Sequence, residues 1–293
     1  MAKARELKKR QKAVGNIKRI TRTMQMIATS KFARAQGRAT QSKPYSEGIF
    51  ELVTELARRA GNIDHPLVSG PSGGVPKTAK PLVLVVTSDR GLCGPYNGSI
   101  IRTAMRHLRE IGFDNCIVEV AGRKGLGVFK FNGITIGRHV QVGDNPTVED
   151  VHHLANDYMQ RFTAGEVSAV HVIFMNFISV SRQKPEVLQL LPLKPPASDD
   201  AGEAKGPAVE YDFSPPAPQL LSDLLPVTVR TTLFQAFLDA VVSEHIARMV
   251  AMKAATDNAT KMGKDLSRRF NRARQTQITT ELTEIISGAA ALE

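Results

Sequence analysis

One eight-residue stretch, TSDRGLCG at residues 87–94, stands where α/β proteins bind phosphates, between an apolar run and a helical segment. A phosphate loop needs GxxxxGK followed by Ser or Thr, and a dinucleotide fingerprint needs GxGxxG. TSDRGLCG has neither pattern, and the glycines of GRKGLG at residues 122–127 stand in the wrong order. Isolated glycine clusters of this kind are typical of turns. We therefore expect no nucleotide or other cofactor here.

The remaining reactive side chains form no recognisable constellation. His152 and His153 are adjacent, so on a helix they point about 100° apart, and neither has a partner at metal-binding spacing. Ser88 and Asp89 have no nearby base to form a nucleophile elbow. His245 lies on an apolar stripe and is interpreted as a packed histidine. The sequence predicts a protein that is not itself an enzyme, with no catalytic residue and no metal, and with a mechanical or adaptor role.

Composition narrows the class of protein. The chain has 293 residues, 42% of them hydrophobic, which is ample for a buried core. No run approaches the roughly eighteen apolar residues of a membrane span, and the start lacks the apolar segment of a secretory signal. Cys93 and Cys116 lack metal spacing and are interpreted as buried thiols. These features predict a cytosolic or matrix-facing protein.

The net charge of +11 is concentrated at the two ends. Residues 1–43 contain thirteen Lys or Arg against one acid, a net of +12. Residues 230–274 contain nine bases against four acids, a net of +5, whereas the charged residues within 201–213 are mostly acids. A basic stripe of this kind indicates an acidic partner.

Proline divides the chain into three parts. All sixteen prolines fall between Pro44 and Pro226, so both ends can be long helices. Apolar side chains recur there in steps of three, four and seven, which is typical of a coiled-coil seam. The seam positions are Leu7, Val14, Ile17, Ile20, Met24, Ile27 and Ala28 in the first helix, and Phe234, Leu238, Val241, His245, Met249, Met252, Met262, Leu266, Phe270, Ile278, Leu282 and Ile285 in the second.

We expect these helices, over residues 1–58 and 219–288, to pair antiparallel, the second reaching on the order of 90 Å and projecting beyond a compact domain. The alternative is two core helices of an ordinary bundle. Between them, PLVLVVTSD, NCIVEVAG and VSAVHVIFMNFISV read as strands, the last extending toward PEVLQLLPL, with helices over residues 98–112 and 147–165. Residues 78–215 are therefore predicted to form an inserted Rossmann-like α/β domain of mainly parallel strands.

Four stretches resemble one family, the gamma subunit of the F-type ATP synthase: RTMQMIATSKFARAQ, TSDRGLCGPYN, RMVAMKAATDNA and NRARQTQITTELTEIISGAAAL. The resemblance spans essentially the whole chain. It implies the rotating central stalk, which couples proton flow through the c-ring to ATP synthesis and regulates ATPase activity. The C-terminal helix would run up through a ring of three alpha and three beta subunits. Its SGAAALE tip carries few large or charged side chains that could obstruct rotation inside that ring.

The resemblance also implies partners and contact residues. The partners are the alpha and beta subunits, the epsilon subunit and the c-ring, with one copy per complex, peripheral to a bacterial plasma membrane on its cytoplasmic side. The residues implied in partner contact are Lys18, Arg19, Arg22, Met24, Lys31, Arg274, Gln275, Thr279, Glu281, Thr283, Glu284 and, near the membrane-facing end, Tyr211. Charge changes at Lys18 or Arg22 are expected to alter activity modestly, and packing changes at Met24 or Met249 more.

Two alternatives remain open at this point. A basic helix leading into a coiled coil also suits a nucleic-acid-binding protein, although the bases are spread around the helix and few aromatic side chains are available for stacking. A nucleotide-dependent α/β enzyme would bind or turn over ATP or NAD as the isolated chain.

Overall fold

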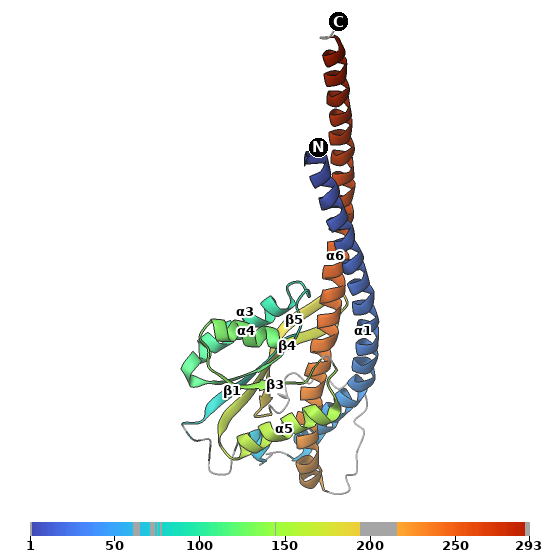
Figure 1. The fold of residues 1–293 in the computed structure, drawn as a ribbon. Helices are drawn as coiled ribbons and strands as arrows, with labels where there is room; N and C mark the ends of the chain where they lie inside the picture. The colour runs from blue at the N-terminus through green and yellow to red at the C-terminus, as the bar shows by residue number, and fades with distance from the viewer. Residues whose placement is uncertain are drawn as a thin grey trace. The chain divides into compact units, whose positions relative to one another are not determined.

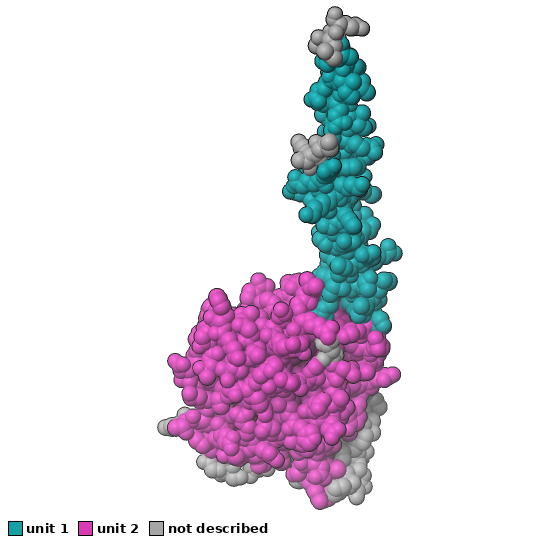
Figure 2. All heavy atoms as spheres, viewed as in Figure 1, with its two compact units in different colours: residues 1–30, 248–293 teal, residues 31–247 magenta. Residues whose placement is uncertain are grey.

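The computed structural model describes residues 2–60, 65–70, 74, 76, 78–143, 145–193 and 216–290. The chain divides into two compact units (Figure 2). The first comprises residues 1–30 and 248–293, and the second comprises residues 31–247. We call them the two-helix unit and the α/β unit and describe each by itself.

Two long helices form the ends of the chain, as the sequence predicts. Helix α1 is Ala2–Ala60 and helix α6 is Ala217–Ala290 (Figure 1). Both continue through a proline, Pro44 in α1 and Pro226 in α6. A proline removes one helical hydrogen bond, but the segments beside these two are held by burial of Leu56 and Leu225, each 1% exposed.

A five-stranded sheet forms the centre of the α/β unit, in the order β3-β2-β1-β4-β5. The strands are β1 (Lys80–Val86), β2 (Ile117–Ala121), β3 (Ile136–Val140), β4 (Val167–Ser179) and β5 (Arg182–Leu191). The first four pair in parallel, and β4 and β5 form an antiparallel hairpin. The connecting helices are α2 (Pro66–Ser69), α3 (Tyr96–Ile111), α4 (Arg123–Phe131) and α5 (Val148–Thr163), with a 3-10 turn at Phe113–Asn115.

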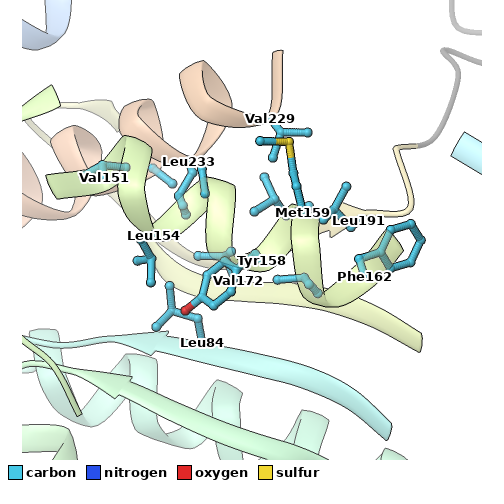
Figure 3. Packing of buried hydrophobic residues seen from close by; sticks show 14 of the residues in the cluster. Leu84, Val151, Leu154, Tyr158, Met159, Phe162, Val172, Leu191, Val229 and Leu233 are labelled. Carbon is cyan, nitrogen blue, oxygen red and sulfur yellow. The ribbon is translucent and has the colours of Figure 1, made fainter. Parts of the chain in front are cut away.

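Helices cover both faces of the sheet, which explains the continuous apolar sequence of β1. Leu82 and Leu84 point into one core layer with α5 and α6, whereas Val83 and Val85 point into another with α3 and α4. Figure 3 shows Tyr158 of α5 beside Leu84 in the first layer. A strand buried on both faces loses the alternation that an exposed face imposes.

The structure corrects two local expectations. The GRKGLG segment, interpreted as turns, leads from Gly122 into helix α4, and strand β3 follows it without having been predicted. The PEVLQLLPL segment is not an extension of β4 but part of β5, which returns antiparallel to it. Glycine-rich helices and short edge strands carry weak periodicity, so neither is visible in sequence alone.

Within the described residues, α6 alone is long and apolar enough to cross a membrane, judged by length and composition, although no continuous apolar run was found in the sequence. Of its most apolar window, 56% is buried inside the fold. A core helix of a soluble protein passes the same test, so this is weak support for a membrane span.

Candidate functional site

The two helices of the two-helix unit pack antiparallel along a narrow seam. Thr256 Oγ1 donates to Thr21 Oγ1 at 2.8 Å, and a Cβ built on Gly263 would lie 4.0 Å from Val14. A step of seven residues forward along α1 is therefore matched by a step of seven residues backward along α6, as in an antiparallel pair. Ala28, one further heptad along α1, is only 2% exposed. Small side chains at seven-residue spacing allow this close approach.

The predicted seam is wrong at several of its apolar positions. Ile17, Ile20, Ile27 and Met262 are each more than half exposed. The buried positions follow a strict seven-residue repeat that includes Thr21, a residue the apolar pattern omitted. The three isoleucines lie beside this buried row on α1 and add exposed apolar surface to the two-helix unit.

The last turns of α6 carry apolar side chains that no other described residue covers. Ile278, Leu282, Ile285 and Ile286 are between 51% and 72% exposed. Within the two-helix unit, α1 begins several turns short of the C-terminal end of α6 (Figure 1). The predicted continuation of the seam through these residues is therefore wrong, since the described part of α1 offers no partner there. An unpartnered apolar helix of this kind is suited to contact another protein.

The residues of α6 expected to contact partners are all on this exposed stretch. They are Arg274, Gln275, Thr279, Glu281, Thr283 and Glu284. The Thr279 and Thr283 hydroxyls donate back to carbonyls four residues earlier, at 3.0 and 2.8 Å. Gln275, Thr279, Thr283 and Glu284 are among the residues that line a shallow hollow on the surface of α6.

The expected contact residues of α1 divide between the two units. Arg19 and Arg22 are exposed on the two-helix unit, and Lys18 and Met24 are half-buried there. Lys31 belongs to the α/β unit, where it lines a pocket with other basic residues. Tyr211 lies outside the described residues.

The TSDRGLCG loop caps helix α4. Asp89 Oδ1 accepts from Arg123 N at 3.0 Å, the Ser88 carbonyl from Lys124 N at 3.1 Å, and Thr87 Oγ1 from Gly125 N at 2.9 Å. These are the backbone donors that a phosphate would need at a helix N-terminus. Since the loop already occupies them, this helix start is a structural cap.

Glycine is required where the loop meets α4. Gly122 has φ +87°, and a Cβ there would lie 2.1 Å from the Thr87 carbonyl oxygen. A Cβ at Gly125 would lie 2.7 Å from Thr87 Oγ1. Glycines in this segment therefore permit a close backbone approach, which explains a cluster that the sequence motifs did not.

A buried carboxylate organises the other side of the sheet. Glu119 of β2 is 3% exposed and accepts from Arg138 at 2.9 Å, Arg161 at 2.8 Å and Tyr158 Oη at 2.8 Å. Burial, followed by the Glu119 charge, raises the pKa of Tyr158 well above its ordinary value. Burial alone would lower the pKa of Arg138, but the Glu119 carboxylate raises it overall. Each charged side chain of the cluster has a partner of opposite charge, so the cluster is better suited to holding the fold rigid than to catalysis.

Other reactive side chains stay scattered. His152 and His153 lie on α5, and burial together with Arg230 and His153 lowers the pKa of His152. His245 is 3% exposed, as a packed histidine should be. Cys93 is buried against Asn97, whereas Cys116 is only partly buried. Among the described residues no group of three His, Cys, Asp or Glu could hold a metal ion.

Comparison with known proteins identifies the family. A family model described as ATP synthase matches residues 3–292. The ATP synthase gamma chain of Rhodopirellula baltica is 42% identical over 299 residues, covering 100% of both chains, and that of Leptospira biflexa is 38% identical over 295 residues, again covering 100% of both. The chain belongs to the ATP synthase gamma-chain family.

Solved structures agree with gamma-chain membership at the level of the fold. A chain of the Euglena gracilis mitochondrial ATP synthase rotor superposes with a TM-score of 0.64 at 17% identity, covering 94% of this chain and 99% of that one. A chain from another rotational state of that enzyme gives 0.66 at 18% identity, covering 99% and 95%. The gamma-chain relatives give the nucleic-acid alternative no support.

Proposed function

We propose that this chain is the rotating central-stalk subunit of an F-type ATP synthase, a non-catalytic part of the complex. The observation that carries the proposal is the full-length match to gamma chains, at up to 42% identity. The exposed apolar turns at the end of α6 support it, because such turns suit a helix that is surrounded by other subunits.

The proposed mechanism needs asymmetry and no reactive group. Three beta subunits of identical sequence adopt different conformations only if something distinguishes them, and a shaft with unequal sides does so. In the two-helix unit, α6 is paired with α1 over part of its length and continues alone beyond the N-terminal end of α1. The cross-section of the unit therefore changes along its length. Each orientation then favours a different nucleotide state in each beta subunit, and proton-driven rotation moves every site through binding, synthesis and release.

The interaction free energies of the contacts indicate which of them can drive the conformational change in a beta subunit. Shifting a subunit almost completely between two conformations takes about 5.5 kcal/mol of differential interaction. One exposed ion pair contributes at most about 1 kcal/mol. Single changes at Lys18 or Arg22 should therefore reduce activity only modestly, and the contacts must be summed over many residues, including the exposed band at Ile17 and Ile20.

We further propose which surfaces meet which partners. Lys18, Arg19, Arg22 and Lys31 would face acidic segments of the beta subunits, and the exposed turns of α6 would lie inside the ring of alpha and beta subunits. The α/β domain, residues 78–215, would be the foot that binds the epsilon subunit and rests on the c-ring, with one copy per complex. The complex would be peripheral to the plasma membrane, with this chain on its cytoplasmic side.

The first test is capture from membranes with the full-length chain. Recovery of alpha, beta and epsilon chains with ATPase activity would support the rotor proposal, and recovery of none would refute it.

The second test asks whether the helix pair transmits the motion. Ala28→Leu should force the two helices apart, because Ala28 is 2% exposed in the seam, whereas Ala13→Leu makes the same change at an exposed position of the same helix. In reconstituted vesicles we expect Ala28→Leu to lower proton pumping per ATP hydrolysed, and Ala13→Leu to leave it unchanged. Equal pumping ratios in both variants would contradict a mechanical role for the seam.

A further inference from the structure

Two threonines meet in the seam of the two-helix unit. Thr256 Oγ1 of α6 donates to Thr21 Oγ1 of α1 at 2.8 Å, and Thr21 Oγ1 donates to the Lys18 carbonyl at 3.1 Å. Thr21 is buried and Thr256 is half-buried. Met252 and Ala259, both buried, flank Thr256 on the same face of α6. A chain of two hydrogen bonds therefore crosses from one helix to the other inside a largely apolar seam.

Side-chain size by itself specifies the register of this helix pair only weakly. The buried row on α1 consists of Val14, Thr21 and Ala28, none of them large. Val14 is level with Gly263, just as Thr21 is level with Thr256. A shift of seven residues keeps the same helix faces together and would bring Thr21 level with Gly263. Neither residue is large enough to obstruct that shift, so the observed register needs another cause.

The hydrogen bond across the seam distinguishes the observed register from its neighbours. After a shift of seven residues, Thr21 would be level with Gly263 in one direction and with Met249 in the other. Neither side chain can donate a hydrogen bond to the Thr21 hydroxyl. A buried polar group that loses its partner costs free energy, so both shifted registers are disfavoured. A polar residue in a coiled-coil seam is known to fix register in this way, at some cost in stability.

Polar contacts within one helix carry no information about register. Arg269 Nε is 2.8 Å from Asp265 Oδ2 within α6, and Thr23 Oγ1 donates to the Arg19 carbonyl at 3.1 Å within α1. Both contacts would survive if one helix slid along the other. The bond between the two seam threonines would not, because its members belong to different helices.

We propose that Thr21 and Thr256 set the axial register of α1 against α6 in the two-helix unit. They act as positioning residues, since their hydroxyls hold one helix level with the other. The role assigned to this register rests on the proposed rotor function: it keeps α6 from sliding along α1 when the helix pair carries load. The register itself is a property of the chain and can be measured without partners.

Disulfide formation in two cysteine reporters measures the register of the full-length chain. The first carries Leu7→Cys, Val14→Cys and Gly263→Cys, so the thiol at position 263 joins position 14 in the observed register and position 7 after a shift. The second carries Val14→Cys, Gly263→Cys and Phe270→Cys and detects the opposite shift. Seven residues of helix rise about 10 Å, beyond the Cα separation that a disulfide tolerates. A Cβ at Gly263 would meet no neighbour closer than 4.0 Å, so the new side chain fits.

Mass spectrometry of the linked peptides, after thiol–disulfide exchange, gives the ratio of shifted to observed linkages. We expect Thr21→Val to raise this ratio about fivefold, because it removes a hydrogen bond that the observed register alone makes. Thr21→Ser keeps the hydroxyl and should retain the natural ratio. Thr23→Val makes the same change at an exposed position of α1 and should have no effect. Circular dichroism should show equal helix content in all variants, since a buried valine still packs in the seam.

The proposal is overturned if Thr21→Val leaves the ratio of linkages unchanged, or if Thr23→Val changes it as much as Thr21→Val does. It is also overturned if Thr21→Ser behaves as Thr21→Val does, because the hydroxyl would then not be the cause. These linkages are formed within the chain alone, so such a result would leave the rotor proposal standing. Capture from membranes tests that proposal separately.

Discussion

A partly buried carboxyl group in the α/β unit should make the stability of this protein depend on pH in an unusual direction. Asp239 of α6 accepts a hydrogen bond from Gln235 Nε2 at 2.9 Å. Burial raises the pKa of Asp239 from 3.8 to about 6; the bond from Gln235 and the charge of Lys43 oppose the shift, and Glu186 of β5 adds to it. Desolvation therefore outweighs the favourable contacts.

The sign follows from proton binding in the two states. Between about pH 4 and pH 6, the folded chain keeps the Asp239 proton while the unfolded chain releases it, so the free energy of unfolding falls as the pH rises through this window. A change from 3.8 to about 6 corresponds to about 3 kcal/mol at 1.36 kcal/mol for each pKa unit. Above pH 6 the ionised carboxylate destabilises the fold by that amount.

Asp239→Asn removes the charge and keeps an oxygen that can accept from Gln235. We expect this variant to be more stable than the natural chain by up to about 3 kcal/mol at pH 8 and equal to it at pH 4. Urea unfolding of the full-length chain at pH 4, 6 and 8 measures the difference. Asp223→Asn, an exposed position of the same helix, is the control for charge alone. A stability gain that is the same at every pH, or a loss at pH 8, would refute the desolvation reasoning.

Two further substitutions test the α/β unit by the same unfolding measurement. Gly122→Ala should destabilise by roughly 3 kcal/mol, because its Cβ would meet the Thr87 carbonyl oxygen at 2.1 Å and its φ is +87°. Gly127→Ala, with nothing within 4 Å, should be neutral or stabilise by up to about 1 kcal/mol, and equal effects at both glycines would contradict the close approach. Glu119→Gln should cost roughly 2 kcal/mol, below the usual range for a broken buried pair because its arginine partners are partly exposed, and an unchanged midpoint would show that the cluster is not stabilising.

The sequence by itself determined the elements that depend on short-range patterns of residues. The confinement of proline to the middle of the chain predicted both long helices, and the apolar run around Leu84 predicted a strand of a mainly parallel sheet. The resemblance of four stretches to gamma subunits identified the family, which full-length relatives confirm. Backbone propensity and periodicity act over a few residues, so they can be read without knowing what packs where.

Only the tertiary structure decided which side chains meet. Ile17 was predicted to lie in the seam but is exposed, whereas Thr21, which the prediction omitted, lies in the seam with Ala28, which was predicted there. Close packing of two helices depends on the size of the side chains as well as on their polarity. Glu119 is 19 residues from one arginine partner and 42 from the other, and the pocket that Lys31 lines joins α1 to residues more than a hundred positions away. Such contacts depend on the path of the chain between their members, which no local pattern of residues specifies.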